Sequence, residues 1–149
     1  VQIRFPDCDP FNHLNNARYL DYFMNAREDH AAENYEFHPY RYAAKTSRNW
    51  VVKQNQIAYL KPAFLGEMVV IQSVIREIRE RQTLVEMFMY NQDKSQLKSL
   101  LWATLTFVDL KTGKSIPHTD DVLEIFEPLV VPFENKVTFS ERVAEFKKK

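Results

Sequence analysis

RFPDCDPFNHLNNARYL, the stretch from Arg4 to Leu20, contains the change from an extended start to a long helix, and this change decides the fold. Before the turn, Val1–Phe5 is predicted to be a short apolar strand that a proline and an aspartate-rich turn bring to an end. Asn15 or Asn16 offers a side-chain oxygen to cap a helix, and Ala17–Ala32 follows without an internal proline or glycine. The sequence therefore predicts a strand, a turn and a long helix in that order.

The predicted helix carries one continuous, largely apolar face. Its members recur at three- and four-residue steps, the spacing that places side chains on one side of a helix. They are Tyr19, Leu20, Phe23, Met24, Ala26, Arg27, His30 and Ala31. A helix of about sixteen residues spans about 24 Å, the width of a small domain. We therefore expect a largely buried helix that runs through the centre of the molecule.

From residue 50 onward the apolar pattern changes to a period of two, which is typical of strands. Four long strands are predicted: Trp50–Leu60, Met68–Ile78, Thr83–Tyr90 and Leu97–Leu110. Short connections predict that consecutive strands are antiparallel neighbours, and long twisted strands curl around whatever they pack on. The segment 34–49 is expected to be irregular, and Asp120–Phe126 to form a short helix. The predicted fold class is α+β, with a curved antiparallel sheet wrapped around one long central helix.

Length and composition narrow the class of protein. The 149 residues are 45% apolar, so we expect a single domain over 1–149, with its core over about 1–127 and a C-terminal extension over 128–149. Twenty basic residues balance twenty acidic ones, which argues against a nucleic-acid partner. Two glycines in the whole chain exclude a phosphate-binding loop, a dinucleotide fingerprint and a nucleophile elbow. The single cysteine, Cys8, and the lack of a leader or a long apolar run predict a soluble cytoplasmic protein.

Three segments together resemble a known family. Arg4–Leu20 is similar to the opening motif of hot-dog thioesterases of the 4-hydroxybenzoyl-CoA thioesterase type, Tyr59–Glu67 resembles their strand-turn-strand signature, and Asp109–Lys114 resembles a later landmark. The likeness spans Gln2–Phe126, and the run His13–Asn16 is closest to a branch that includes long-chain acyl thioesterases. The resemblance implies a hot-dog fold, a homodimer or tetramer with active sites at the subunit boundary, and no cofactor, because coenzyme A is part of the substrate.

Asp9 is the candidate catalytic residue. Thioester hydrolysis needs a group that attacks the carbonyl carbon or activates a water, and a group that stabilises the oxyanion. A carboxylate on the turn can supply the first, and the free amides at the start of the helix can polarise the thioester oxygen. The residues leave open whether Asp9 is the nucleophile or the general base. The structural alternative, that Asp7 and Asp9 are turn or capping residues, is the commoner use of aspartate beside proline, and it is the resemblance that favours catalysis by Asp9.

The candidates for substrate contact lie around the same turn and on the elements that follow it. A metal site needs three or more ligands and the histidines are scattered, so no metal is expected. His13 is expected first to support the turn and second to position the substrate. Capping accounts for one of the two asparagines, and the resemblance places Asn16 at the family's polar site position. The substrate-binding candidates are His13, Asn15, Asn16, Tyr19 and Tyr59.

A group of arginines is the candidate contact for coenzyme A. Coenzyme A carries three phosphates, and arginine binds phosphate in a bidentate manner. Arg76, Arg79 and Arg81 lie around the turn between the second and third predicted strands, where they resemble the family's nucleotide-binding strip. The alternative is a charged hairpin in which these arginines alternate with Glu77 and Glu80.

The function implied by the resemblance is hydrolysis of an acyl-CoA to free acid and coenzyme A. A close variant takes its acyl group from an acyl carrier protein instead. A second class is a hot-dog hydratase or dehydratase, although the run Asp9–His13 has that motif's ingredients in the wrong order. A third class is a non-catalytic acyl-CoA-binding subunit. Neither a nucleic-acid partner nor a membrane span is expected.

Overall fold

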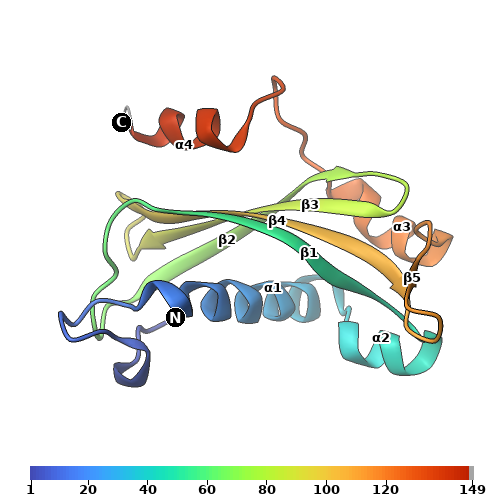
Figure 1. Ribbon diagram of the computed structural model, residues 1–149, viewed down its shortest axis with the longest axis horizontal. Coiled ribbons are helices and arrows are strands. Elements are labelled where there is room, and N and C mark those ends of the chain that lie inside the picture. The colour runs from blue at the N-terminus through green and yellow to red at the C-terminus, as the bar shows by residue number, and fades with distance from the viewer. Residues whose placement is uncertain (148–149) are drawn as a thin grey trace.

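The computed structural model describes residues 1–147, which form a curved sheet with a long helix against one face (Figure 1). The helices are α1 (Tyr19–Tyr35), α2 (Pro39–Thr46), α3 (Asp120–Phe126) and α4 (Phe139–Lys147), with 3-10 turns at Phe5–Asp7, Asn16–Arg18 and Glu127–Leu129. The strands are β1 (Arg48–Tyr59), β2 (Val69–Ile78), β3 (Gln82–Asn91), β4 (Leu97–Asp109) and the short β5 (Lys114–Ser115). Within residues 1–147, no helix combines the length and the apolar character needed to cross a bilayer. The predicted α+β class is confirmed.

The strands pair in the order β1-β4-β3-β2, all antiparallel, and β5 pairs with the end of β4. The prediction that consecutive strands are neighbours is confirmed for β2 with β3 and for β3 with β4, but it is wrong for β1 and β2, which lie at opposite edges. The connection after β1 is not a hairpin, because the amides of Leu60 and Lys61 both donate to the carbonyl of Lys98 on β4. The chain therefore crosses the end of β4 before it reaches the far edge.

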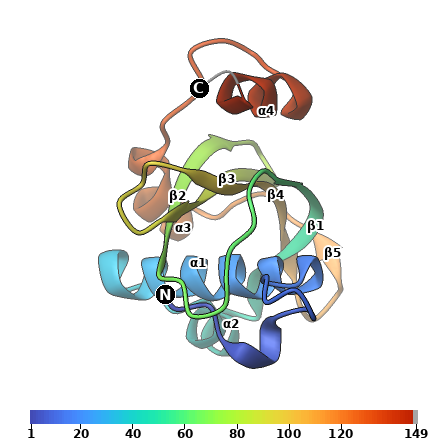
Figure 2. The same ribbon diagram turned by 90° about the vertical axis from the view of Figure 1, so that its left-hand side faces the viewer.

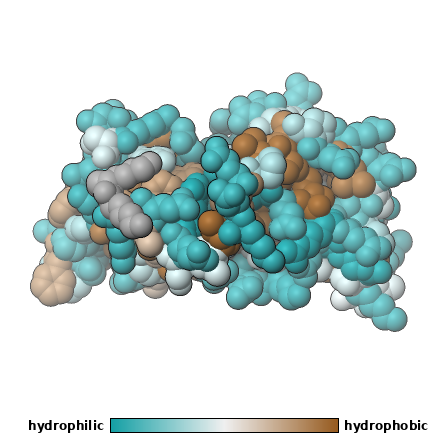
Figure 3. Space-filling model, turned by 90° about the horizontal axis from the view of Figure 1, so that it is seen from above, coloured by the Kyte–Doolittle hydropathy of each residue, from teal (hydrophilic) through white to brown (hydrophobic). Residues whose placement is uncertain are grey.

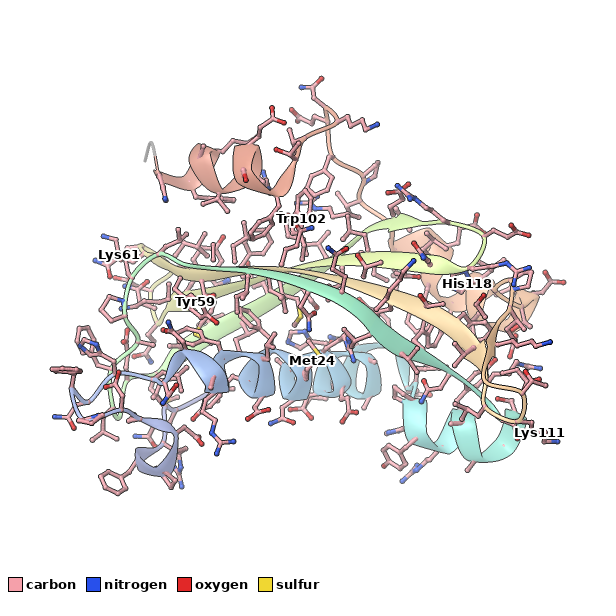
Figure 4. The ribbon with its side chains drawn as sticks, viewed as in Figure 1. Met24, Tyr59, Lys61, Trp102, Lys111 and His118 are labelled. Atoms are coloured by element: carbon pink, nitrogen blue, oxygen red, sulfur yellow. The ribbon has the colours of Figure 1, made fainter. Side chains whose placement is uncertain are left out.

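The helix α1 packs its apolar side against the sheet, as its periodicity predicted. Phe23 is completely buried and belongs to one core with Met87 of β3 and Leu101 of β4, which are direct cross-strand partners. Figure 4 shows Met24 between α1 and the sheet, and Figure 2 shows α1 below the sheet and α4 above it. The α-helix begins two residues later than predicted, at Tyr19, because a 3-10 turn precedes it, and it ends at Tyr35.

Two local predictions are wrong. Val1–Phe5 is not a strand: it contributes a single bridge, between Gln2 and Met68, and Phe5 already begins a 3-10 turn that contains a proline. The segment 34–49 is not irregular either, because it includes α2. Pro39 occupies the first turn of α2, where its missing N–H and fixed φ favour helix formation. Pro39 therefore begins a helix here and does not interrupt one.

The C-terminal extension packs on part of the face of the sheet opposite α1. Beyond the 3-10 turn Glu127–Leu129 the chain crosses that face and ends in α4 (Figure 1). Trp102 of β4 lies on the side that faces α4 (Figure 4). Seen from above α4, the surface is mostly polar, with an apolar area toward the end that carries α3 (Figure 3). The last two residues of the predicted extension, 148 and 149, lie outside the described residues.

Candidate active site

Asp9 lies on a tight turn that uses only one of its two carboxylate oxygens. Asp9 Oδ1 accepts hydrogen bonds from the amides of Phe11 (2.9 Å) and His13 (3.1 Å). The backbone of the turn closes with a bond from the amide of Asp9 to the carbonyl of His13 (2.8 Å). Within residues 1–147, Asp9 Oδ2 accepts no hydrogen bond, and the residue is half-buried. The structural role and the catalytic role weighed for Asp9 can therefore coexist, one on each oxygen.

The turn is held against the connection between β1 and β2. The amide of Leu14 donates to the carbonyl of Ala63 (2.7 Å), and the amide of Leu65 donates to the carbonyl of Asn12 (2.8 Å). His13 and Phe64 form a β-bridge between the two segments. Two sequence landmarks about fifty residues apart thus form one wall, and this wall fixes the orientation of the Asp9 carboxylate.

The start of the helix follows directly from this turn. Asn15 is the capping residue: its Oδ1 accepts from the amide of Ala17 at 3.0 Å. The Tyr59 hydroxyl donates to the carbonyl of Asn16 at 3.1 Å, and the Tyr59 and Tyr19 rings meet edge to face with centroids 5.0 Å apart. Asn16 is exposed, and its side-chain amide has no hydrogen-bond partner in the described part of the chain. The structure therefore assigns the cap to Asn15 and leaves Asn16 free to contact a substrate.

The two aspartates of the turn differ in their surroundings. Asp7 Oδ2 accepts a hydrogen bond of 2.7 Å from the hydroxyl of Tyr22, a buried residue of α1. Burial, followed by this bond to Asp7, raises the pKa of the Tyr22 hydroxyl, so the phenol stays protonated and keeps donating. Asp7 is therefore engaged in holding the turn against α1, while Asp9 keeps a free oxygen.

Cys8 is not placed as a nucleophile. Burial, and then the charges of Asp7 and Asp9, raise the pKa of its thiol. A raised pKa keeps the thiol protonated at neutral pH, and it is the thiolate that reacts. Its Sγ donates to the carbonyl of Arg4 at 3.4 Å, which is a structural contact.

The neighbourhood of His13 contains one residue that the sequence did not single out. The His13 ring lies edge to face with Phe64, with centroids 5.1 Å apart. Lys98 of β4 is 3% exposed. Its Nζ donates to the carbonyl of Pro62 (2.9 Å) and pairs with Glu67 (3.2 Å), both in the connection between β1 and β2. Lys98 thus fixes the connection that supports the Asp9 turn. A lysine within an apolar strand gave no signal of this role, because its partners come from a distant loop.

The three arginines predicted for coenzyme A have different surroundings. Arg76 donates from Nε and Nη2 to the buried Glu86 (3.0 and 2.9 Å) and from Nη1 to the carbonyl of Val131 (3.0 Å). Arg79 pairs with Glu77 (2.8 Å) and is exposed, as the charged-hairpin alternative describes. Arg81 is also exposed, and its Nη1 donates to the carbonyl of Ser115. Arg79 and Arg81 are accessible to a ligand, while the guanidinium of Arg76 is engaged on all three nitrogens.

One chain does not bring these arginines to Asp9. The carbonyls of Arg79 and Glu80 accept hydrogen bonds from His118, which places their turn beside His118. Figure 4 shows His118 at the opposite end of the sheet from Tyr59, which contacts the start of α1. A site that uses Asp9 together with Arg79 and Arg81 needs a second copy of the chain.

Comparisons with known proteins identify the family and the fold of the chain. A family profile described as thioesterase-like superfamily matches residues 3–126. The long-chain acyl-CoA thioesterase FadM of Escherichia coli (strain K12) is 26% identical over 130 residues, which cover 87% of this chain and 96% of FadM. Among solved structures, the probable thioesterase YbaW of Escherichia coli superposes with a TM-score of 0.75 at 25% identity, covering 88% of this chain and 96% of YbaW. A DHNA-CoA thioesterase from Staphylococcus aureus has the same fold, with a TM-score of 0.77 at 16% identity over 100% of this chain and 92% of its own.

The fold and the family inferred from the sequence motifs are both confirmed. The sheet wrapped around α1 is a hot-dog fold, shared with these thioesterase structures. The hydratase and non-catalytic alternatives find no support in the comparisons. The profile match covers most of the sequence, so the chain belongs to the thioesterase-like superfamily and is a thioester hydrolase.

Proposed function

We propose that this chain hydrolyses acyl-CoA thioesters to a free acid and coenzyme A, with Asp9 as nucleophile or general base. The observation that supports the proposal is that the two carboxylate oxygens of Asp9 differ. Oδ1 accepts hydrogen bonds from two turn amides, while Oδ2 accepts none from residues 1–147. The likeness to FadM supports acyl-CoA as the substrate class.

The geometry supports two balanced routes to the products. As a base, Asp9 takes a proton from water, the oxygen adds to the carbonyl carbon, the C–S bond breaks, and the coenzyme A thiolate accepts the proton. As a nucleophile, Oδ2 adds to the carbonyl carbon and expels the thiolate. Water then adds to the Asp9 carbonyl carbon of the mixed anhydride, which restores the Asp9 carboxylate with one oxygen from water, and the two protons of the water go to the released acid and to the thiolate. In both routes the carbonyl oxygen lies near the start of the helix, where Asn16 is free to donate. A single turnover in heavy-oxygen water separates them, because only the nucleophilic route leaves the label in Asp9.

The proposed assembly is a homodimer, or a tetramer built from two dimers, joined along β1. This strand is twelve residues long, pairs only with β4 within residues 1–147, and exposes Val51 (45%) and Val52 (42%) near its middle. An unprotected edge with exposed valines favours pairing with another strand. Antiparallel pairing with a second β1 sets the Tyr59 end of one chain beside the Arg48 end of the other. Arg79 and Arg81 of one chain then approach Asp9 of its partner, and we propose that they hold coenzyme A.

Replacement of Asp9 tests the catalytic role. Asp9→Asn keeps the acceptor for the two turn amides but removes the charge, so we expect turnover of an acyl-CoA panel to fall by about 10²- to 10⁴-fold. Thiol release measures the rate, and circular dichroism checks the fold. Asp21→Asn, on the exposed side of α1, is the matched control and should keep wild-type rates. Normal thioester cleavage by folded Asp9→Asn protein would refute the mechanism.

Mixing two impaired variants, one in Asp9 and one in the two arginines, tests the shared site. Arg79→Ala with Arg81→Ala should raise KM more than it lowers kcat, because these groups bind the ground and transition states alike. Co-expressed with Asp9→Asn chains, the double variant should form mixed dimers in which one site has Asp9 and both arginines intact. We expect those dimers to recover activity with wild-type KM. Activity that remains at the level of the separate variants, or a single-subunit mass in light scattering, would rule out this arrangement.

A further inference from the structure

Lys98 is the one lysine or arginine that is buried within residues 1–147. Its side chain is 4% exposed, and its Nζ donates to the carbonyl of Pro62 (2.9 Å) and pairs with Glu67 Oε2 (3.2 Å). The ammonium group also lies 5.3 Å from the centre of the Phe64 ring. All three partners belong to the connection between β1 and β2, residues 60–68. One buried cation thus contacts three points of a single irregular segment.

The backbone of Lys98 holds the same connection. Its carbonyl accepts hydrogen bonds from the amides of Leu60 (2.9 Å) and Lys61 (3.1 Å). Glu67 completes the arrangement, because its Oε1 accepts from the amide of Phe64 (3.0 Å) while its Oε2 pairs with Lys98. The connection is therefore anchored to the first residues of β4 through both main-chain and side-chain contacts.

The other side of the connection supports the Asp9 turn, residues 9–13. The Phe64 ring meets the His13 ring edge to face, with centroids 5.1 Å apart. The amide of His13 is one of the two donors to Asp9 Oδ1, at 3.1 Å. A continuous path of contacts therefore runs from the Lys98 ammonium through Phe64 and His13 to the carboxylate that we propose for catalysis.

The Lys98–Glu67 pair is suited to fixing geometry more than to adding stability. The cost of removing two charges from water offsets much of their attraction when an ion pair is buried. Its demand on geometry is strict, because a buried ammonium group without acceptors is costly. Catalytic groups must be held within about 0.5 Å of their productive position, and an error of about 1 Å can cost about 100-fold in rate. A buried ion pair can give an irregular segment that precision.

We propose that Lys98 is a positioning residue: its ammonium group, paired with Glu67, fixes the connection and through it the direction of the Asp9 carboxylate. The inference rests on the proposed function, because it concerns the rate at which Asp9 acts. Lys98 does not touch the substrate in this arrangement. It should therefore govern the chemical step and leave coenzyme A binding, which we assign to Arg79 and Arg81, unchanged.

Lys98→Met tests this role, because methionine is an unbranched, uncharged side chain that fits apolar surroundings. We expect kcat for an acyl-CoA to fall by about tenfold to hundredfold, with KM within about twofold of wild type. Lys61→Met, the same substitution at an exposed lysine of the connection, is the matched control and should keep wild-type rates. Circular dichroism checks the fold of each variant.

Glu67→Gln keeps the fold of the connection under less strain and provides the comparison if Lys98→Met does not fold. The amide oxygen can still accept from Phe64, but the charge that pairs with Lys98 is gone. We expect kcat to fall by about fivefold with KM unchanged, because a charge-assisted bond is replaced by a neutral one. Glu86→Gln, which breaks the buried pair with Arg76, controls for lost stability and should leave kcat unchanged.

A double-mutant cycle shows whether Lys98 acts through Asp9. In the Asp9→Asn background the carboxylate is already lost, so Lys98→Met should lower the residual rate by less than about twofold. Thiol release with enzyme in excess over the acyl-CoA measures that slow rate. A loss as large as in the wild-type background would show that Lys98 acts on something other than Asp9 and would overturn the proposal.

Three further outcomes would also overturn it. They are a wild-type kcat in folded Lys98→Met or Glu67→Gln protein, a change confined to KM, and an equal loss of kcat in Glu86→Gln, which would trace the effect to stability. The proposed function fails separately, through normal turnover by Asp9→Asn. A slow Asp9→Asn variant beside a normal Lys98→Met variant would refute only the role of Lys98.

Discussion

The two faces of the sheet are stabilised by different kinds of interaction. On the α1 face, alternate residues of β3 and β4 such as Met87 and Leu101 join Phe23 in an apolar core. On the α4 face, the intervening residues include Glu86, which is completely buried and accepts hydrogen bonds from Arg142, Arg76 and Trp102 at 2.8–3.0 Å. The α1 face is stabilised by the burial of apolar surface, and the α4 face by hydrogen bonds from several donors to one carboxylate.

The difference shows how each face specifies its partner. Apolar burial is non-directional, so many arrangements of similar volume would satisfy the α1 face. A buried carboxylate has to be matched by particular donors, so Glu86 selects the position of α4 through Arg142. Arg142 also lies over the Phe146 and Phe133 rings, at 4.8 and 5.4 Å from their centroids, which adds apolar contact to the same anchor.

The largest expected effect comes from the apolar face. Phe23→Ala should cost about 3–5 kcal/mol of unfolding free energy, because it removes a fully buried ring and leaves a cavity between α1 and the sheet. Urea denaturation measures the loss. Asn25→Ala on the exposed side of the same helix should change stability by less than about 0.5 kcal/mol. Equal effects of the two substitutions would contradict the assignment of the core.

Substitutions on the α4 face, which we call the ionic face, should cost less unfolding free energy than Phe23→Ala. Their effects should depend more strongly on one another. Glu86→Gln should cost about 2–3 kcal/mol, because two arginines lose their charged acceptor while remaining partly hydrated. In a double-mutant cycle with Arg142→Gln, the combined cost should fall short of the sum by at least about 0.5 kcal/mol. Additive costs would mean that α4 is held by its aromatic contacts rather than by Glu86.

The smallest effect is a pH dependence confined to the ionic face. Burial alone would raise the pKa of Glu86, but the bonds from Arg142, Trp102 and Arg76 outweigh it and lower that pKa. A lowered folded pKa gives stability that is fully present above the unfolded value of roughly 4.3 and is lost as the pH falls through the folded value. The stability gap between wild type and Glu86→Gln should therefore shrink in acid, as denaturation at stepped pH would measure. A gap that stays constant in acid would mean that Glu86 has the same pKa in the folded and unfolded chains, which would contradict a lowered folded pKa.

Much of the fold was predictable because its signals are local. The apolar steps through Phe23 predicted α1, and alternation predicted the four long strands, since both periods follow from the geometry of a single element. The same signals missed α2, because Pro39 was interpreted as part of an irregular segment. They also gave β1 and β2 as neighbours, because a short connection does not reveal that Lys98 draws the chain across the end of β4.

The turn that carries the candidate site was predictable from the sequence, but its hydrogen bonds were not. The motif around Asp9 located the turn, and capping chemistry left Asn15 and Asn16 as alternatives. The choice of Asn15, and the use of one Asp9 oxygen by the turn, depend on the backbone angles φ and ψ between Asp9 and Asn15, which residue types alone do not fix. Arg76 was grouped with Arg79 and Arg81 by proximity, yet strand alternation turns it toward Glu86.

The sequence by itself determined the elements, the family motifs and the turn that carries Asp9, because each depends on residues within a few positions of one another. Only the tertiary structure decided that β1 and β2 lie at opposite edges and that Glu86 meets Arg142 across 56 residues. Such pairings depend on which distant segments the packed chain brings together, and a charged residue in a strand carries no mark of the partner it will find.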